Sequence, residues 1–372
     1  MKLSVRLIVV LLCAALVISI PFFLSSPSML SEAREALTDS QEEDDGGVDL
    51  DFGRLFMPYA MAEDSGLVVE ELDADGKLSI PEEWALPFDF SLAPLPDPDC
   101  YKENGYEDQS IRIRTEIREM FNSNVNIAYV EIAHPSQLRT ATAGPINVNK
   151  AHYVKTIAVN NNAVIAINGD DYVKMDSKKD KSFEIRMTEF VTQDHKRSKT
   201  YKDHDILVID KQGDFHLFLL ADGLEEYFKQ NNEDVVQAFS FGPALVVDGM
   251  MQNLEDRKSV YAGTYKNPRA AIGQKGPLSY VLVVVESQKR GDGSGVTHAE
   301  LAQIMSELGC IQAYNLDGGN SAEMVMPWYD LDQNKSKDHD PVFYCKGDNA
   351  AKVRPQSDII YFATAVPEEE RK

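Results

Sequence analysis

Apolar residues occur in short runs separated by polar turns over most of the chain from about residue 106. Residues 126–132 and 163–167 are two such runs, and their length and flanking polar residues predict strands. Lys211, Gln212, Gly213 and Asp214 are turn formers, so the runs before and after them predict a hairpin. Further strands are expected at residues 205–210, 215–220, 244–247, 269–273, 278–286, 311–316 and 358–363.

Residues 297–308 predict an amphipathic helix. The Thr297 hydroxyl can accept a hydrogen bond from a backbone N–H of the first turn, and Glu300 three residues later completes a capping box. Gly309 suits the position after a helix. The apolar stripe consists of Leu301, Ile304, Met305 and Leu308. A second, shorter helix is expected from the apolar residues of 151–158. The pattern predicts a mixed α/β or α+β domain with a mixed sheet and several hairpins, because strict βαβ alternation is absent.

The first thirty residues carry a targeting pattern. Lys2 and Arg6 precede an uncharged apolar run at residues 7–24, which is long enough to span a bilayer. Basic residues before the run favour a cytoplasmic N-terminus, so the rest of the chain would lie outside the cytoplasmic membrane. An uncleaved anchor and a cleaved signal peptide both fit. We therefore expect an extracytoplasmic protein, either membrane-anchored through residues 7–24 or secreted.

Residues 31–105 read as an acidic, proline-containing stalk before a domain at 106–367. The net charge of the chain is −23, and residues 32–75 contain fifteen acidic and two basic residues. A chain this acidic is not expected to bind nucleic acid, which requires clustered Lys and Arg. The prolines at 87, 94, 96 and 98 favour extended geometry.

Three cysteines follow the apolar run: Cys100, Cys310 and Cys345. None forms a Cys-x-x-Cys pair, which excludes a zinc ribbon or a thioredoxin-like site. An oxidising compartment would permit one disulfide, for which Cys310–Cys345 is our choice. The alternative is three small buried thiols.

The strongest chemical pattern is the loop after the strand at residues 311–316. It reads Asp317-Gly318-Gly319-Asn320-Ser321 and follows Asn315-Leu316. Two glycines let the backbone approach a ligand closely, and their N–H groups can receive phosphate or sugar oxygens. An ordinary Asp-Gly-Gly turn is the alternative.

Other motifs precede this loop in a fixed order: Ala166-Ile167-Asn168-Gly169, then residues 241–249, then Asn267-Pro268-Arg269-Ala270-Ala271-Ile272-Gly273. Over about residues 125–365 the ordered set resembles the phosphodiester glycosidase family. The resemblance implies hydrolysis of a sugar joined through its anomeric oxygen to a phosphodiester. It implies a sugar-phosphodiester or polysaccharide substrate in the cell envelope or in exported glycan.

The resemblance also implies roles for individual residues. Arg269 would bind phosphate, because its donors form a fork that matches phosphate oxygens. Asp317 would act as acid or base, with Asp170 or Asp171 as the second carboxylate that glycosidases generally use. A structural ion pair is the alternative for Arg269. The expected substrate-binding positions are Asn168, Gly169, Asn315, Gly318, Gly319, Asn320, Ser321 and, before the last strand, Arg354.

The chain departs from the family in two places. Asp170 and Asp171 follow Asn168-Gly169 where the family has a small residue and aromatics, and Asn320 stands where it has Gly. Loss of phosphate specificity would give a hydrolase of another glycan. Loss of catalysis would give a glycan-binding envelope protein on the same scaffold.

No cofactor is required by the sequence. Residues 71–82 place Asp73, Asp75, Gly76, Ser79 and Glu82 at the spacing of a calcium loop, but Glu71 replaces the first Asp. A hairpin turn at residues 73–76 is the alternative. The seven histidines show no metal-ligand spacing.

Overall fold

A computed structural model describes residues 77–144, 150–170, 204–231, 233–254, 265–287, 294–329, 340–349 and 351–371. Every described residue belongs to one compact unit, Leu72–Lys372. Within these ranges, no helix is long and apolar enough to cross a bilayer. The predicted anchor and most of the acidic segment lie outside the described residues.

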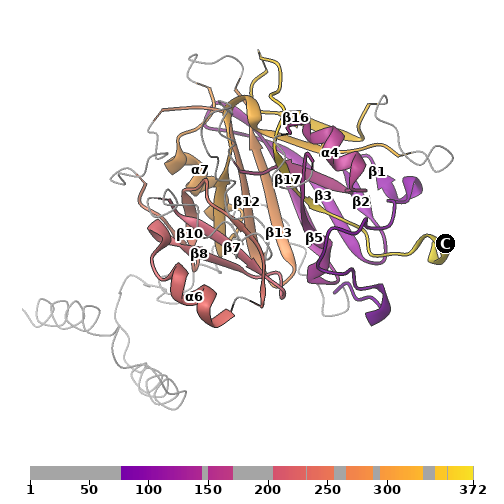
Figure 1. Ribbon diagram of the computed structural model, residues 1–372. Coiled ribbons are helices and arrows are strands. Elements are labelled where there is room, and N and C mark those ends of the chain that lie inside the picture. Colours follow the sequence, from indigo (N-terminus) through magenta and orange to yellow (C-terminus); the bar gives the residue numbers. More distant parts are fainter. Residues whose placement is uncertain are drawn as a thin grey trace, which may run out of the picture. The chain divides into compact units, whose positions relative to one another are not determined.

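The largest sheet has nine strands in the order β1-β2-β3-β4-β13-β12-β14-β10-β11 (Figure 1). Its strands are Tyr101–Lys102 (β1), Gly105–Glu107 (β2), Ile111–Met120 (β3), Ser123–Ile132 (β4), Ala244–Val247 (β10), Met250–Met251 (β11), Arg269–Gly276 (β12), Ser279–Val285 (β13) and Gln312–Leu316 (β14).

Two smaller sheets accompany it. The five-stranded sheet has the order β16-β15-β6-β17-β5, and the three-stranded sheet has the order β8-β7-β9. Their strands are Leu138–Thr142 (β5), Ile165–Asn168 (β6), Ile206–Asp210 (β7), Phe215–Phe218 (β8), Val235–Phe239 (β9), Glu323–Met326 (β15), Phe343–Lys346 (β16) and Asp358–Phe362 (β17).

The described helices are few and short. The α-helices are Val154–Asn160 (α4), Leu224–Asn231 (α6) and His298–Glu307 (α7). The 3-10 turns are Glu82–Trp84 (η3), Pro98–Cys100 (η4), Pro135–Gln137 (η5), Leu219–Ala221 (η7), Gly319–Ser321 (η8) and Glu368–Glu370 (η9).

The described strands pair in an antiparallel manner throughout. The predicted hairpins β7–β8 and β12–β13 are confirmed, with Ile209 opposite Phe215 and Ala271 opposite Val283. The parallel pairing described is the isolated bridge between Ser287 and Asp348. The fold is therefore α+β and strand-dominated, and its sheets are not the mixed sheet that the sequence suggested. Short turns account for hairpins such as β7–β8 and β12–β13, whereas pairs such as β12–β14 and β6–β17 are formed between segments that are distant in the sequence.

Three clusters of buried residues hold four layers together, in the order α7, the nine-stranded sheet, the five-stranded sheet and α4. One cluster joins Ile272 and Leu282 of the large sheet to Ile167 and Ile360 of the five-stranded sheet. A second joins the opposite face of the large sheet to α7, and a third joins the outer face of the five-stranded sheet to α4. Because side chains alternate along a strand, β12 sends Ala270 and Ile272 to the inner core and Ala271 toward α7. Figure 1 shows α7 and α4 on the two sides of the sheets.

The helix predicted at 297–308 is confirmed as α7, including its cap. Thr297 Oγ accepts from the Glu300 N–H at 3.1 Å, and Glu300 Oε2 accepts from the Thr297 N–H at 2.8 Å. Gly309 follows with a φ of +79°. These local signals position α7 against β10 and β14.

The last part of the predicted stalk packs against the domain. Arg139 of β5 donates through its Nη atoms to the carbonyls of Pro87, Asp89 and Ser91, at 2.9, 2.7 and 3.0 Å. Its Nε donates to the hydroxyl of Tyr361 at 3.1 Å. Further along, Ala93 and Leu95 are buried. Residues 77–105 therefore belong to the packed unit, because backbone carbonyls satisfy a buried guanidinium there.

The expected Cys310–Cys345 disulfide is wrong. Cys310 and Cys345 are both free and buried, and Cys100 is free and half-buried. Cys310 lies in the core beside α7, whereas Cys345 lies in the core between the two larger sheets. The large sheet separates the two thiols.

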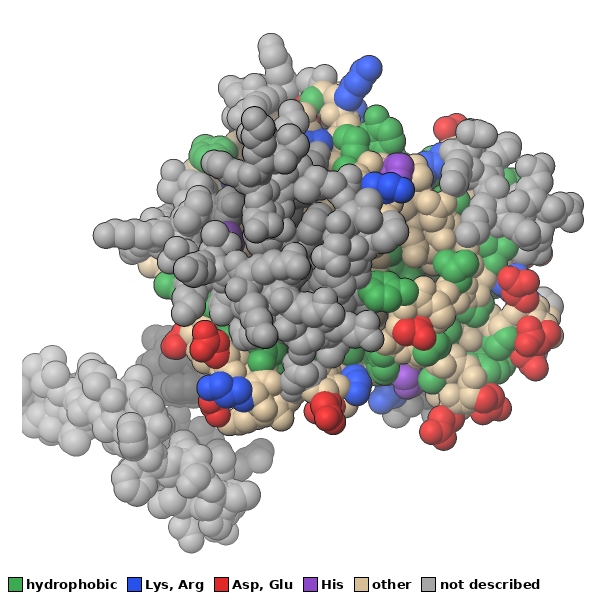
Figure 2. Space-filling view, in the orientation of Figure 1, with side chains coloured by type: hydrophobic (Ala, Val, Ile, Leu, Met, Phe, Trp, Pro, Cys, Tyr) green, Lys and Arg blue, Asp and Glu red, His purple; other side chains and the backbone are tan. Residues whose placement is uncertain are grey.

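Acidic side chains gather along the lower and right-hand margins of the face drawn in Figure 2. Glu82, Glu83 and Asp89 are among the exposed acidic residues of the packed unit. The acidity of the chain is thus present on the packed unit and is not confined to the N-terminal segment.

Candidate functional site

The loop Asp317–Ser321 packs tightly on the start of β12. Gly319 adopts a φ of +62°, and its N–H donates to the carbonyl of Pro268 at 2.9 Å. A Cβ on Gly318 would lie 2.7 Å from that carbonyl oxygen. Both glycines are therefore needed for this close approach.

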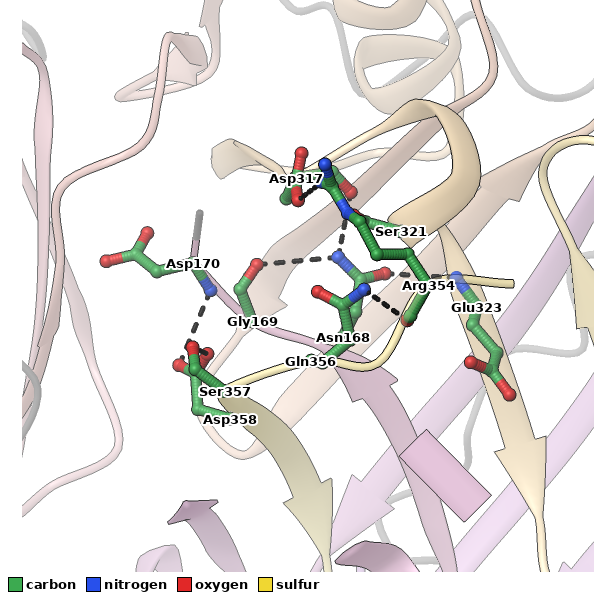
Figure 3. A network of polar contacts seen from close by, with 10 residues as sticks. All are labelled: Asn168, Gly169, Asp170, Asp317, Ser321, Glu323, Arg354, Gln356, Ser357 and Asp358. Carbon is green, nitrogen blue, oxygen red and sulfur yellow. Dashed lines mark hydrogen bonds and ion pairs between the residues drawn. The ribbon is translucent and has the colours of Figure 1, made fainter. Parts of the chain in front are cut away.

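Asn168 ties this loop to the five-stranded sheet (Figure 3). Its Nδ2 donates to the carbonyl of Asp317 at 2.8 Å, and its Oδ1 accepts from the N–H of Glu323 at 3.1 Å. The N–H of Asp317 donates to the carbonyl of Gly169 at 3.3 Å. Asn168 is fully buried. Both polar atoms of its amide bind backbone groups, one at each end of the loop.

Asp317, Ser321 and Arg354 form a cluster, which we call the Asp317 cluster. Arg354 Nη2 lies 2.5 Å from Asp317 Oδ2, and Arg354 Nε donates to Ser321 Oγ at 2.8 Å. The side chain of Arg354 is 42% exposed and that of Asp317 is 9% exposed. A partly exposed guanidinium therefore holds a nearly buried carboxylate in place.

Asp170 does not join this cluster. Its two carboxylate oxygens accept from the N–H groups of Ser240 at 2.9 Å and Phe241 at 3.0 Å. Figure 3 shows its carboxylate pointing away from Asp317 and Arg354. The residue is 1% exposed, so Asp170 anchors the segment before β10. Asp171 lies outside the described residues.

Asp358 lies beside the candidate site and was not singled out from the sequence. Its carboxylate accepts from Ser357 Oγ at 3.0 Å and from the Asp170 N–H at 3.4 Å. A Cβ on Gly169 would lie 2.4 Å from Asp358 Oδ2. The available signal was a carboxylate that begins an otherwise apolar strand, at residues 358–363. Asp358 thus explains why the motif requires glycine after Asn168.

Asn315 and Asn320 lie on opposite sides of Asp317 but differ in exposure. Asn315 is fully buried, and its Nδ2 donates to the carbonyl of Gly242 at 2.7 Å. Its Oδ1 has no hydrogen-bond partner among the described residues. Asn320 is exposed, and its carbonyl accepts from the Arg354 N–H at 2.9 Å. Asn320 is thus the residue of the loop that a ligand in solvent meets first.

Arg269 is placed behind the loop. Its Nε donates to the carbonyl of Val296 at 3.2 Å and its Nη2 to that of Tyr265 at 3.1 Å. Burial lowers the pKa of Arg269 to about 10. The structural ion pair considered from sequence is not observed among the described residues, because the recorded partners are carbonyls.

The residues predicted for the site thus fall into two groups. Asn168, Gly169, Asp317, Ser321 and Arg354 share one network, in which the exposed polar groups are Arg354 and the edge of Asp317. Arg269, Asn315 and Asp170 each make separate backbone contacts. Chemically, the Asp317 cluster offers a carboxylate base or nucleophile beside a cation that can neutralise a developing negative charge.

Metal ligands are not grouped in the part of the chain that the structure describes: no set of three His, Cys, Asp or Glu side chains there could hold an ion. Four of the proposed calcium-loop residues, from Glu71 to Gly76, lie outside it, so that prediction is not tested.

Comparison with known proteins agrees with the motif order. Residues 161–362 match the family model described as phosphodiester glycosidase. An uncharacterized protein of Bacillus subtilis (strain 168), the SPbeta prophage-derived YomE, is 31% identical over 90 residues. That match covers 24% of this chain and 14% of YomE, so the chain spans about a seventh of this relative.

Two solved structures are similar at low identity. The zebrafish N-acetylglucosamine-1-phosphodiester alpha-N-acetylglucosaminidase catalytic domain, auto-inhibited by its pro-peptide, is 17% identical with a TM-score of 0.49, over 68% of this chain and 84% of that one. A hypothetical protein from Synechocystis is 14% identical with a TM-score of 0.45, over 68% and 62%. The family model spans more than half of the 372 residues and includes the Asp317 loop, and the chain therefore belongs to the phosphodiester glycosidase family.

Proposed function

We propose that the chain is a hydrolase that releases a sugar from a sugar-1-phosphodiester linkage, with Asp317 and Arg354 as its catalytic residues. The observation that carries the proposal is the Asp317–Arg354 pair, which is held at the end of β14 by Asn168 and reaches solvent. Membership of the phosphodiester glycosidase family supports the reaction class.

The geometry suits this chemistry with a single carboxylate. As a general base, Asp317 would accept a proton from a water molecule that attacks the anomeric carbon. As a nucleophile, Asp317 would bond to that carbon, and a water molecule would then cleave this bond, release the sugar and restore the carboxylate. The bond between the anomeric carbon and the phosphodiester oxygen breaks, and its electron pair leaves with that oxygen. Arg354 is placed to stabilise the departing anion. A phosphodiester is a fair leaving group, so the reaction does not require Asp170 as a strong acid.

We also propose that the reaction takes place outside the cytoplasmic membrane. Residues 1–30 carry the targeting pattern described above, which supports action outside the cytoplasmic membrane on envelope or exported glycan. Protease added to intact cells should digest the full-length protein if it is exposed outside, and should leave it intact if it faces the cytoplasm.

A glycan-binding protein on the same scaffold is the rival. The engagement of both Asp170 oxygens with backbone N–H groups favours it, because most glycosidases use two available carboxylates. Such a protein would bind glycan equally well with or without the Asp317 carboxylate.

The deciding experiment compares the full-length protein with Asp317→Asn on a panel of nucleotide sugars and sugar-1-phosphodiesters. Asn keeps the size of the side chain but removes its charge. We expect free sugar from the wild type and at least about a 100-fold lower rate from the variant. Equal rates would remove Asp317 from the mechanism, and glycan binding without any release would favour the rival.

A further inference from the structure

Glu323 is a buried carboxyl group that the proposed mechanism does not use. It begins β15 two residues after the Asp317 loop and is 2% exposed. Figure 3 shows its carboxyl group pointing away from Asp317, so it takes no part in the chemical step itself. Its Oε2 atom has no hydrogen-bond partner among the described residues. Burial of a charged carboxylate with one oxygen unsatisfied is costly, so these surroundings favour the neutral acid.

The carboxyl group of Glu323 holds the start of α4. It accepts from the N–H of Val154, the first residue of that helix, and from the hydroxyl of Tyr344 on β16. A helix leaves its first N–H groups without partners inside the helix, and the side chain of Tyr153 before α4 does not bind one. Glu323 therefore caps α4 from a strand that is distant in the sequence.

A first chain of hydrogen bonds leads from the start of α4 to Asp317. The N–H of Glu323 donates to Asn168 Oδ1 at 3.1 Å. Asn168 Nδ2 donates in turn to the carbonyl of Asp317 at 2.8 Å. A displacement of Glu323 is thus passed to Asp317 through a single buried amide.

A second chain of hydrogen bonds leads from the same place to Arg354. His152, two residues before α4, accepts from and donates to the backbone of Gln356 at 2.7 and 2.9 Å. Gln356 is fully buried, and its Nε2 donates to the carbonyl of Arg354 at 2.7 Å. The start of α4 is therefore tied to both members of the Asp317–Arg354 pair.

We propose that Glu323 is a positioning residue for the reaction proposed above. As a neutral acid it joins the start of α4 to Asn168 and so keeps Asp317 in place beside Arg354, and its ionisation loosens this join. The effect on sugar release rests on the proposed function, whereas the coupling between Glu323 and the Asp317 loop does not.

The elements around Glu323 add few charges. Tyr344 contacts it and remains a donor, because burial and the neighbouring carboxyl raise the pKa of Tyr344. Lys346 lies opposite Glu323 on β16, but its Nζ donates to two carbonyls of the following turn. The start of α4 contributes the exposed His152 and Lys155, and β6 carries no titratable side chain.

Ionisation of Glu323 falls in an accessible pH range. Burial raises the pKa of Glu323 to about 7, against smaller opposing effects of the two hydrogen bonds that it accepts. In a locally opened state the carboxyl meets water and titrates near its ordinary value. Opening is therefore favoured as the pH rises from about 6 to about 8.

Amide hydrogen exchange of the full-length protein tests the coupling without any substrate. Rates for residues 317–321 are compared in the wild type and Glu323→Gln at about pH 6 and about pH 8, so that the intrinsic rate at each pH cancels. We expect the ratio of the wild-type rate to the variant rate to rise about tenfold over this range. The turn at residues 211–214, between β7 and β8, should keep a constant ratio.

Two results of the exchange experiment would overturn the proposal. A constant ratio at residues 317–321 would mean that the loop opens independently of Glu323. Equal exchange rates at residues 317–321 and in β13 would mean that both report unfolding of the whole unit.

Sugar release gives a second readout. Relative to Glu323→Gln, the kcat of the wild type should fall about tenfold from pH 6 to pH 8. Tyr344→Phe removes a hydrogen bond that favours the carboxylate, so it should move this fall to higher pH. Tyr153→Phe, at an exposed tyrosine, is the control and should leave the fall in place.

The two readouts keep this proposal separate from the proposed function. A fall in kcat that Glu323→Gln and the wild type share would assign it to another group and overturn the positioning role. Exchange at residues 317–321 that follows Glu323, without sugar release from any substrate, would defeat the proposed function alone.

Discussion

Arg354 and Asp317 are 37 positions apart in the chain, yet Arg354 Nη2 lies 2.5 Å from Asp317 Oδ2. Arg354 precedes β17, and Asp317 follows β14 of the other large sheet. The pair therefore links the two sheets at the edge where both strands carry polar ends. The Asp317 side chain is 9% exposed and that of Arg354 is 42% exposed, so the carboxylate is buried and the guanidinium meets solvent.

Arg354→Lys should separate catalysis from stability. A lysine ammonium is a point charge and cannot hold Asp317 and Ser321 with the fixed fork of a guanidinium. We expect kcat/KM for sugar release to fall about 100-fold. The free energy of unfolding, measured by urea denaturation, should change by no more than about 1 kcal/mol, because lysine keeps a positive charge beside the Asp317 carboxylate.

Arg114→Lys is the matched control for this change. Arg114 is 61% exposed and pairs with Glu116 at 3.1 Å on β3. It should alter neither sugar release nor stability measurably. An equal loss of activity in both variants would mean that Arg354 has no specific role.

Gly169→Ala should destabilise the domain. The new Cβ would lie 2.4 Å from Asp358 Oδ2, and Asp358 is fully buried. We expect the free energy of unfolding to fall by about 1 to 3 kcal/mol, as for other overpacked positions. Gly276→Ala is the control, because nothing lies within 4 Å of its Cβ. Equal effects of the two substitutions would show that the contact with Asp358 is not what selects glycine at 169.

Local signals predicted much of the fold. The capping box of Thr297 and Glu300 depends on residues three positions apart, so α7 could be predicted to within a residue or two. The β12–β13 hairpin depends on one apolar pattern broken by a glycine-containing turn. Local signals could not predict which distant segments pair as strands. The antiparallel character of the sheets and the packing of residues 77–105 follow from such distant contacts.

The candidate site shows the same division. The order of motifs singled out both Asp317 and Arg354, and the structure brings the two side chains into contact. The engagement of Asp170 with Ser240, 70 residues away, could not be read from spacing. Asp358 acts across 188 residues on Asp170. Its role depends on the lack of a Cβ at Gly169, which has no signal in a single sequence.

Glu323 should make stability depend on pH. Burial raises the pKa of this carboxyl from 4.5 to about 7, against smaller opposing effects of hydrogen bonds from Tyr344 and the Val154 N–H. The folded state therefore binds the proton more tightly than the unfolded state, so stability falls as the pH rises from about 4.5 to about 7. The loss should be on the order of 3 kcal/mol, because Glu323 is almost fully buried.

Glu323→Gln should remove this dependence. The variant should match the wild type near pH 4 and exceed its free energy of unfolding at pH 8, measured by urea denaturation at each pH. Glu307→Gln, at an exposed position of α7, is the control and should follow the wild type throughout. A constant difference between wild type and Glu323→Gln from pH 4 to pH 8 would show that Glu323 ionises normally.

Arg139→Lys should release the segment at residues 86–92. Arg139 is 6% exposed and binds the carbonyls of Pro87, Asp89 and Ser91, which belong to alternate residues of a segment that bends at residues 88–90. This arrangement leaves Phe88 and Phe90 exposed, at 39% and 52%. A lysine ammonium carries three N–H donors on a single nitrogen, so it cannot span the three carbonyls as the two Nη atoms of the guanidinium do. Limited chymotrypsin digestion should therefore cut after Phe88 or Phe90 at least about tenfold faster in the variant, because cleavage follows the population of the locally opened segment.

Arg118→Lys is the control for this experiment. It changes an arginine on β3 that pairs with Glu116, and it should leave this cleavage rate unchanged. Equal cleavage in the wild type and Arg139→Lys would mean that the segment is held by its buried Ala93 and Leu95 and that the arginine contributes only to the packing beneath it.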